Sequence, residues 1–230
     1  MIRYFRSIIF WGILVLFVIL FGLILPPLSL FFKNKQRFYF SVFSFFTKML
    51  LILTWIPVKV LGRENLKDYD MQQGLIVAVN HSSLLDTFVL LAKLPFVFKF
   101  IAYGAGFRLP FIKVLYEGAG YVGAGLKGEK MVPHLVSLRE VLKRKEKIAI
   151  YSRPSMKEGE VKFSEGAVWL SNEFQTPILP VAIKGASELL PMGKFLLGWG
   201  RVILSIGKPS YFSSPDALQK EVSRLYAEIS

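Results

Sequence analysis

His81 and Asp86 are the residues of this 230-residue chain whose types and spacing could move a proton. Asp86 follows His81 by five positions, and both come directly after an apolar run at residues 75–79 and Asn80. On one ideal helix, five residues correspond to a rotation of about 140°, so the two side chains would point in different directions. They can meet only where His81 lies in a turn and Asp86 lies within the helix that follows.

This geometry would suit a general base. A carboxylate that accepts a hydrogen bond from one ring nitrogen fixes the tautomer of a histidine and leaves the other nitrogen free to take a proton. N–H groups at the start of the helix could stabilise a developing oxyanion, and Ser82 or Ser83 could cap that helix. The spacing alone is also compatible with a histidine that only caps a helix.

The remaining composition excludes several other chemistries. The chain has no cysteine, which excludes disulfides, thiolate metal sites, iron–sulfur clusters and cysteine nucleophiles. With His81 and His134 as the two histidines, we expect no metal site and no cofactor. His134, next to Pro133, is interpreted as a surface or packed residue. The sequence contains no Gly-x-Ser-x-Gly nucleophile elbow.

Alternating strands and helices are expected to position His81 and Asp86. From Pro57 onward, short β-type runs alternate with amphipathic stretches, which predicts an α/β domain with a largely parallel sheet and helices on both faces. The expected strands are residues 58–61, 75–79, 98–103, 120–122, 147–151, 178–183 and 202–206. The expected helices are residues 86–93, 129–144, 165–173 and 215–229, the last with Ser214 as N-cap.

The first part of the chain has the composition of a membrane anchor. Residues 8–32 contain no charged residue, which is enough to cross a hydrocarbon core of about 30 Å. Pro26-Pro27 is expected to break this helix near its end. A second apolar stretch, residues 38–58, is interrupted by Lys48, which would have to snorkel, pair or lie flat at the interface.

We therefore predict an anchor over residues 1–57, followed by one domain over residues 58–230. The anchor would be a helical hairpin, or a deep helix followed by an interfacial one. A cleaved signal peptide is disfavoured, because its apolar region is usually about 7–15 residues and no small-residue cleavage site follows here.

The charge balance indicates the class of partner. Lys and Arg number 29 against 16 Asp and Glu, a net charge of +13, while 53% of residues are hydrophobic. A basic chain this apolar is expected to contact anionic membrane lipids and not nucleic acid. Positive residues flank the first apolar stretch on both sides, so they do not indicate its orientation in a membrane. The absence of cysteine and the basic domain fit the cytoplasmic face of a membrane.

The segment Asn80-His81-Ser82-Ser83-Leu84-Leu85-Asp86 resembles the Asn-His-x4-Asp signature of glycerolipid acyltransferases, typified by 1-acyl-sn-glycerol-3-phosphate acyltransferase. Residues 57–66, 163–167 and 176–183 resemble further elements of that family. The resemblance implies a membrane enzyme in which His81 is the general base and Asp86 orients it. It also implies a lysolipid as acceptor and acyl-CoA or acyl-carrier protein as acyl donor.

Two further family motifs are altered in this chain. Ala124 stands where the second motif, Gly-x-x-Phe-Ile-x-Arg, has its arginine. In the third motif, Phe-Pro-Glu-Gly-Thr-Arg-Ser, Arg153-Pro154 replaces Glu-Gly and Met156 replaces the arginine. The resemblance implies that the replaced residues hold the phosphate and glycerol of the acceptor.

We predict that Asn80, Ser82, Ser152 and Arg153 bind substrate. Three explanations of the altered motifs stay open. The acceptor carries a different headgroup, Arg153 supplies the missing positive charge, or catalysis is lost and the protein is a lipid-binding scaffold. Arg153 could also be an ordinary solvated arginine. A hydrolase that uses water as acceptor is a third possible function.

Overall fold

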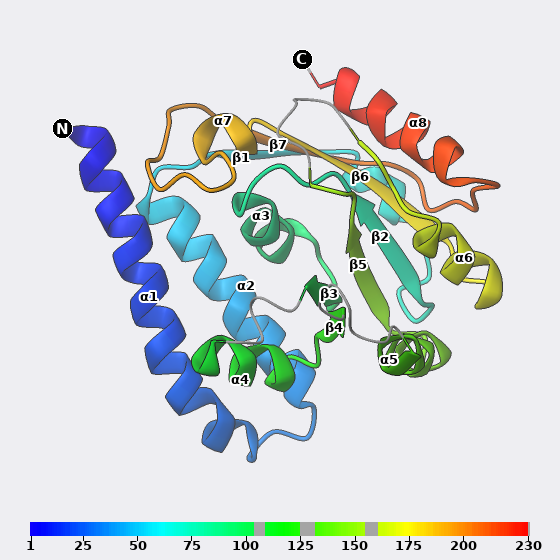
Figure 1. Cartoon of the computed structure of the whole chain (residues 1–230), viewed down its shortest axis with the longest axis horizontal. Coiled ribbons are helices and arrows are strands. Elements are labelled where there is room, and N and C mark those ends of the chain that lie inside the picture. The colour runs from blue at the N-terminus through cyan, green and yellow to red at the C-terminus, as the bar shows by residue number, and fades with distance from the viewer. Residues whose placement is uncertain (104–108, 125–131, 155–160, 230) are drawn as a thin grey trace.

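The computed structural model describes residues 1–103, 109–124, 132–154 and 161–229, and within them the chain forms one seven-stranded sheet (Figure 1). The strand order is β1-β7-β6-β2-β5-β3-β4, and neighbours pair in parallel except for β6 and β7. The strands are β1 Val58–Leu61, β2 Leu75–Val79, β3 Lys99–Tyr103, β4 Val122–Ala124, β5 Lys147–Tyr151, β6 Ile178–Lys184 and β7 Val202–Ile206. The prediction of a largely parallel sheet is confirmed.

Helices cover both faces of this sheet, as expected. They are α1 Ile2–Ser29, α2 Lys35–Leu53, the 3-10 helix η1 Arg63–Leu66, α3 Leu85–Lys93, α4 Pro110–Gly118, α5 Val132–Lys143, α6 Gly166–Glu173, α7 Ala186–Leu189 and α8 Pro215–Ala227. Alternate residues of β2 face opposite sides. Leu75, Val77 and Val79 join a core with α1, α2, α3 and α7, whereas Ile76 and Ala78 join a core with α5, α6 and α8.

Most predicted elements lie within two residues of their observed ends, and four strands, β1, β2, β5 and β7, match to the residue. The short strand expected at residues 120–122 is wrong by two positions, because Gly120, with a positive φ of 68°, still belongs to the turn that follows α4 and its C-cap Ala119. Helix α4 itself was not expected. Ser214 caps α8 as predicted, since its Oγ accepts the N–H of Ala217 at 3.2 Å. The start expected for α5 at residue 129 lies outside the described residues.

Helices α1 and α2 form an antiparallel pair along one side of the molecule, seen in blue and light blue in Figure 1. The pair packs on α3 and α4, and its buried residues Phe10, Leu25, Tyr39 and Leu50 belong to the same hydrophobic core as β2. The expected break at Pro26-Pro27 is wrong by two residues, because α1 continues to Ser29. The hydroxyl of Ser29 donates to the carbonyl of Pro26 at 2.7 Å, which helps to close this last turn.

Helix α1 is long and apolar enough to cross a membrane by length and composition, with a mean hydropathy of 3.1 over its most apolar window. Only 22% of that window is buried by the rest of the protein. Its outer side therefore exposes large apolar side chains, including Ile8, Val15, Leu16, Leu23 and Ile24. Such an exposed apolar surface is consistent with membrane association.

Candidate active site

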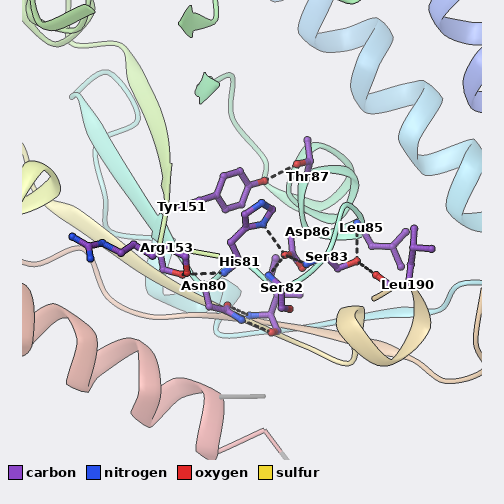
Figure 2. A network of polar contacts seen from close by, with 12 residues as sticks. Asn80, His81, Ser82, Ser83, Leu85, Asp86, Thr87, Tyr151, Arg153 and Leu190 are labelled. Atoms are coloured by element: carbon purple, nitrogen blue, oxygen red, sulfur yellow. Dashed lines mark hydrogen bonds and ion pairs between the residues drawn. The ribbon is translucent and has the colours of Figure 1, made fainter. Parts of the chain in front are cut away.

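The His81–Asp86 pair forms at the carboxyl edge of the sheet, where β2 ends. His81 lies in the turn after β2, and Asp86 lies in the first turn of α3. His81 Nδ1 and Asp86 Oδ2 are 3.0 Å apart (Figure 2). The change from extended strand to helix between them brings together two side chains that one continuous helix would have separated. Ligands commonly bind at this edge of parallel α/β sheets.

Asp86 is held rigidly in this position. Its side chain is fully buried, and Oδ2 also accepts the backbone N–H groups of Ser82 and Ser83 at 2.8 and 2.9 Å. The expected serine cap of α3 is wrong, because its N-cap is Leu84, but Ser83 Oγ accepts the N–H of Leu85 and donates to the carbonyl of Leu190. With its donors all on Oδ2, the Asp86 carboxylate acts as a fixed acceptor for the imidazole.

The imidazole of His81 consequently has one nitrogen committed and one available. An ionised carboxylate can only accept hydrogen bonds, so Nδ1 carries the proton and Nε2 presents a lone pair. Within the described residues, Nε2 has no hydrogen-bond partner, and 23% of the side chain is exposed. This arrangement can accept a proton from a hydroxyl group that approaches Nε2.

Tyr151 and Thr87 also belong to this site, and sequence reasoning did not find them. The ring of Tyr151 stacks on the His81 ring with centroids 4.2 Å apart, and its hydroxyl lies 2.9 Å from Thr87 Oγ1 (Figure 2). Burial raises the pKa of Tyr151 well above its ordinary value, so its hydroxyl stays protonated at neutral pH. The signal that could have found Tyr151 is the pairing of β2 with β5, because this pairing places Tyr151 beside Val79.

Two of the predicted substrate-binding residues hold the backbone around His81. The buried amide of Asn80 donates to the carbonyl of Ile183 at 2.8 Å and accepts its N–H at 2.7 Å, which joins the ends of β2 and β6. The buried Oγ of Ser152 accepts the N–H of His81 at 3.1 Å. Both side chains therefore lie next to the His81–Asp86 pair and fix the turn that carries it.

The other two predicted residues are more open to solvent. Ser82 is partly exposed and contacts Asp86 through its backbone N–H. Arg153 is exposed, and Figure 2 shows its guanidinium directed away from His81. The structure therefore brings Asn80, Ser82 and Ser152 around the pair, but leaves the Arg153 charge outside it.

Two of the altered motif positions, Ala124 and Arg153, lie at the carboxyl ends of β4 and β5. Ala124 is the last residue of β4, which pairs with β3 at the edge of the sheet. Met156, the third, lies outside the described residues. Among the described residues, no group of three or more His, Asp or Glu side chains could hold a metal ion. His134 is on α5, and its side chain lies outside the described part.

Comparisons with known proteins give a family and a fold for the chain. The family model described as Acyltransferase matches residues 57–184, which include the His81–Asp86 pair. No curated protein matches the chain. Among solved structures, the chain is similar to the 1-acyl-sn-glycerophosphate (LPA) acyltransferase PlsC from Thermotoga maritima, with 23% identity and a TM-score of 0.78. That similarity covers 97% of this chain and 92% of the other, and at this identity it concerns the fold.

Proposed function

Because the chain belongs to the Acyltransferase family, we propose that it transfers a fatty acyl group from a thioester to the hydroxyl of a lysolipid. The observation that carries the proposal is the His81 imidazole, which is fixed by Asp86 on one nitrogen and open on the other. The acyl donor would be acyl-CoA or acyl-carrier protein, and no cofactor is needed. The similar PlsC of Thermotoga maritima is described as a 1-acyl-sn-glycerophosphate acyltransferase, which supports a lysolipid acceptor.

The proposed reaction needs one proton transfer in each direction. His81 Nε2 removes the proton of the acceptor hydroxyl, whose oxygen attacks the thioester carbonyl and forms the new C–O bond. Collapse of the tetrahedral intermediate breaks the C–S bond, and the proton held on His81 passes to the leaving thiolate. Asp86 keeps the imidazole in the right tautomer and stabilises its positive charge while it holds that proton.

The proposal also concerns which headgroup the lysolipid acceptor carries. Ala124 and Arg153 replace family residues, and the Arg153 guanidinium is directed away from His81 (Figure 2). Each charge-assisted hydrogen bond missing from a phosphate site removes about 1.5–3 kcal/mol of binding. Of the three explanations, this orientation favours an acceptor other than 1-acylglycerol-3-phosphate, namely a related lysolipid with a different headgroup.

A panel of acceptors tests this proposal. Detergent-purified protein would be incubated with labelled acyl-CoA or acyl-carrier protein and with lysophosphatidate, other lysophospholipids or lyso-amino-acid lipids. We expect a diacyl product from at least one acceptor, and its identity gives the headgroup. A product from lysophosphatidate alone would contradict the headgroup proposal. Release of free fatty acid without any lysolipid would instead indicate a hydrolase.

The competing proposal is a lipid-binding protein of the same fold that has lost catalysis. The observation in its favour is the loss of the family arginine at Ala124, together with the outward position of Arg153. Absence of product from every acceptor with both donors would support it, whereas any Asp86-dependent acyl transfer would exclude it.

We further propose that α1 and α2 anchor the protein, with the domain on the cytoplasmic face. The exposed apolar side of α1 and the positive residues Lys33, before α2, and Lys35 and Arg37, in its first turn, support an anchor. Because the chain lacks cysteine, a single Lys220→Cys substitution on exposed α8 can report its side. We expect an impermeant maleimide to label it only after cells are permeabilised. Labelling in intact cells would place the domain outside.

A further inference from the structure

A second candidate site lies at the opposite end of α3 from His81. An open pocket of about 870 Å³ forms where the end of α2, the start of β1 and the end of α3 meet. Its lining includes the cations Lys48, Arg63 and Lys93 and, among the described residues, no carboxylate. Lys93 is seven residues beyond Asp86, about 10 Å along the axis of α3, so the pocket is separate from the acyl-transfer site.

The three cations have no ion-pair partner among the residues that the structure describes. Burial, and then repulsion from Arg63 and Lys48, lowers the pKa of Lys93. Positive charges gathered in this way without a partner are unfavourable by themselves, and they create a potential that attracts an anion.

The rest of the pocket is apolar. Met49, Ile52, Trp55, Leu94 and Pro95 share its lining with the cations. Lys48 and Ile52 are one turn apart on α2, so a positive group and an apolar side chain lie on the same helix face. A small inorganic anion would use the cations alone. A ligand that combines a phosphate with an alkyl chain would contact both kinds of wall.

Trp55 gives independent support for a ligand at this pocket. It follows Thr54, the C-cap of α2, and has a positive φ of 49°, a backbone conformation that bulky residues rarely adopt. Glycine usually occupies this position after a helix. The side chain is nonetheless 59% exposed, so packing does not explain the choice of residue. An indole held in this way indicates a functional contact, and tryptophan favours the headgroup level of membranes.

We propose that this pocket binds an anionic phospholipid, with the phosphate among Lys48, Arg63 and Lys93 and an acyl chain along Ile52 and Trp55. The occupant is a membrane lipid, since the same helix exposes Phe45, Ile52 and Leu53 next to the pocket. A lipid can therefore reach the cations while its chains stay in the bilayer. The site does not depend on the proposed acyl transfer, because it lies apart from the His81–Asp86 pair.

Selective lipid binding by the full-length protein tests this proposal. Protein in neutral detergent micelles would receive phosphatidylglycerol or phosphatidylcholine, and native mass spectrometry would count the lipid bound. We expect the protein to bind at least about tenfold more phosphatidylglycerol than phosphatidylcholine. Each cation that contacts the phosphate should raise the affinity roughly fivefold. The variant Lys48→Gln/Arg63→Gln/Lys93→Gln should lose this preference. The matched control, Arg139→Gln/Lys208→Gln/Lys220→Gln, removes the same charge from exposed positions elsewhere and should keep it.

A second readout locates the lipid chain. Phosphatidylglycerol with brominated acyl chains should quench the fluorescence of wild-type protein more than that of Trp55→Phe. Removing repelling charges should leave the thermal unfolding midpoint of the first triple variant no lower than that of the wild type. Retention of the preference by that variant, or equal quenching in Trp55→Phe, would overturn the proposal. Displacement of phosphatidylglycerol by equimolar inorganic phosphate would overturn it too, because it would assign the site to a free anion.

Discussion

The imidazole of His81 is restrained on several sides by neighbours from helix α3 and from the end of strand β5. Asp86 fixes Nδ1, Tyr151 covers one face of the ring, and Ser152 accepts the backbone N–H. Such restraint keeps Nε2 in one direction and lowers the cost of orienting it during reaction. At the scale of single residues, the proposal therefore makes predictions about the groups that hold His81 as well as about His81 itself.

Asp86→Asn should test the role of Asp86 toward the His81 imidazole without unfolding the protein. An amide oxygen at this position can still accept the N–H groups of Ser82 and Ser83, so the start of α3 is retained. It cannot stabilise the protonated imidazole, and we expect kcat for acyl transfer to fall about 10²–10⁴-fold. Steady-state kinetics beside a thermal unfolding curve would measure both. A variant that folds normally and keeps full kcat would contradict the role given to Asp86.

Two substitutions of Tyr151 should have different effects. Tyr151→Phe keeps the ring that stacks on His81 and loses the contact with Thr87, so we expect a change in kcat of less than about tenfold, from a contact worth about 1 kcal/mol. Tyr151→Ala removes the ring as well, and should lower kcat further and destabilise the fold by about 3 kcal/mol. If Tyr151→Ala retained wild-type kcat, the ring would not position His81.

Close packing between helices determines how the membrane-associated pair joins the domain. Gly118, at the end of α4, lies against Tyr39 of α2, and a Cβ on Gly118 would come within 2.2 Å of the Tyr39 ring. Glycine at this position therefore allows the two helices to pack closely. At the scale of elements, this contact joins α2 to α4.

Gly118→Ala should therefore weaken the attachment of α2. The added methyl group forces the Tyr39 ring to move, and we expect a loss of about 1–3 kcal/mol of unfolding free energy. Gly12→Ala is the matched control, because nothing lies within 4 Å of a Cβ there. Denaturant titration in detergent would compare them. Equal stability of the two variants would show that α2 does not pack on α4 as described.

Elements were predictable where a local pattern determined them. The alternating β-branched residues of β1, β5 and β7 gave their limits, and the Ser214-Pro215 cap gave the start of α8. Contacts between elements were not predictable in this way. Tyr151 reaches His81 only because β5 pairs with β2, and Asn80 reaches Ile183 only because β6 pairs with β2 on its other side. The local spacing predicted the His81–Asp86 pair, whereas the contacts of Tyr151 and Asn80 that hold it in place depend on the order of the strands in the sheet.

At the scale of the whole molecule, the burial of tyrosines links stability to alkaline pH. Burial is the largest cause that raises the pKa of Tyr69 from 10.0 to about 12, and it also raises the pKa of Tyr116 and Tyr151. A raised pKa means that the folded state holds the proton more tightly than the unfolded chain. This stability is complete below pH 10 and is lost as the pH rises toward 12.

We expect the unfolding free energy of the wild type to fall between pH 10 and 12, and that of Tyr69→Phe to fall less. The difference should be about 1 kcal/mol, because Tyr69 is partly exposed and solvent reduces the effect. Denaturant titrations across this pH window would measure it. An identical slope for the two proteins would show that Tyr69 does not titrate with the fold.

The whole molecule joins the domain that carries the His81–Asp86 pair to an apolar helix pair. Our central proposal is that His81 accepts the proton in acyl transfer. Because the chain has no cysteine, a thiol reagent can follow CoA release without background from the protein. The most direct measurement is the initial rate of lysolipid-dependent CoA release by wild type, His81→Ala and the control His134→Ala. We predict that His81→Ala loses at least about 100-fold in rate while His134→Ala does not. A wild-type rate in folded His81→Ala would contradict the account.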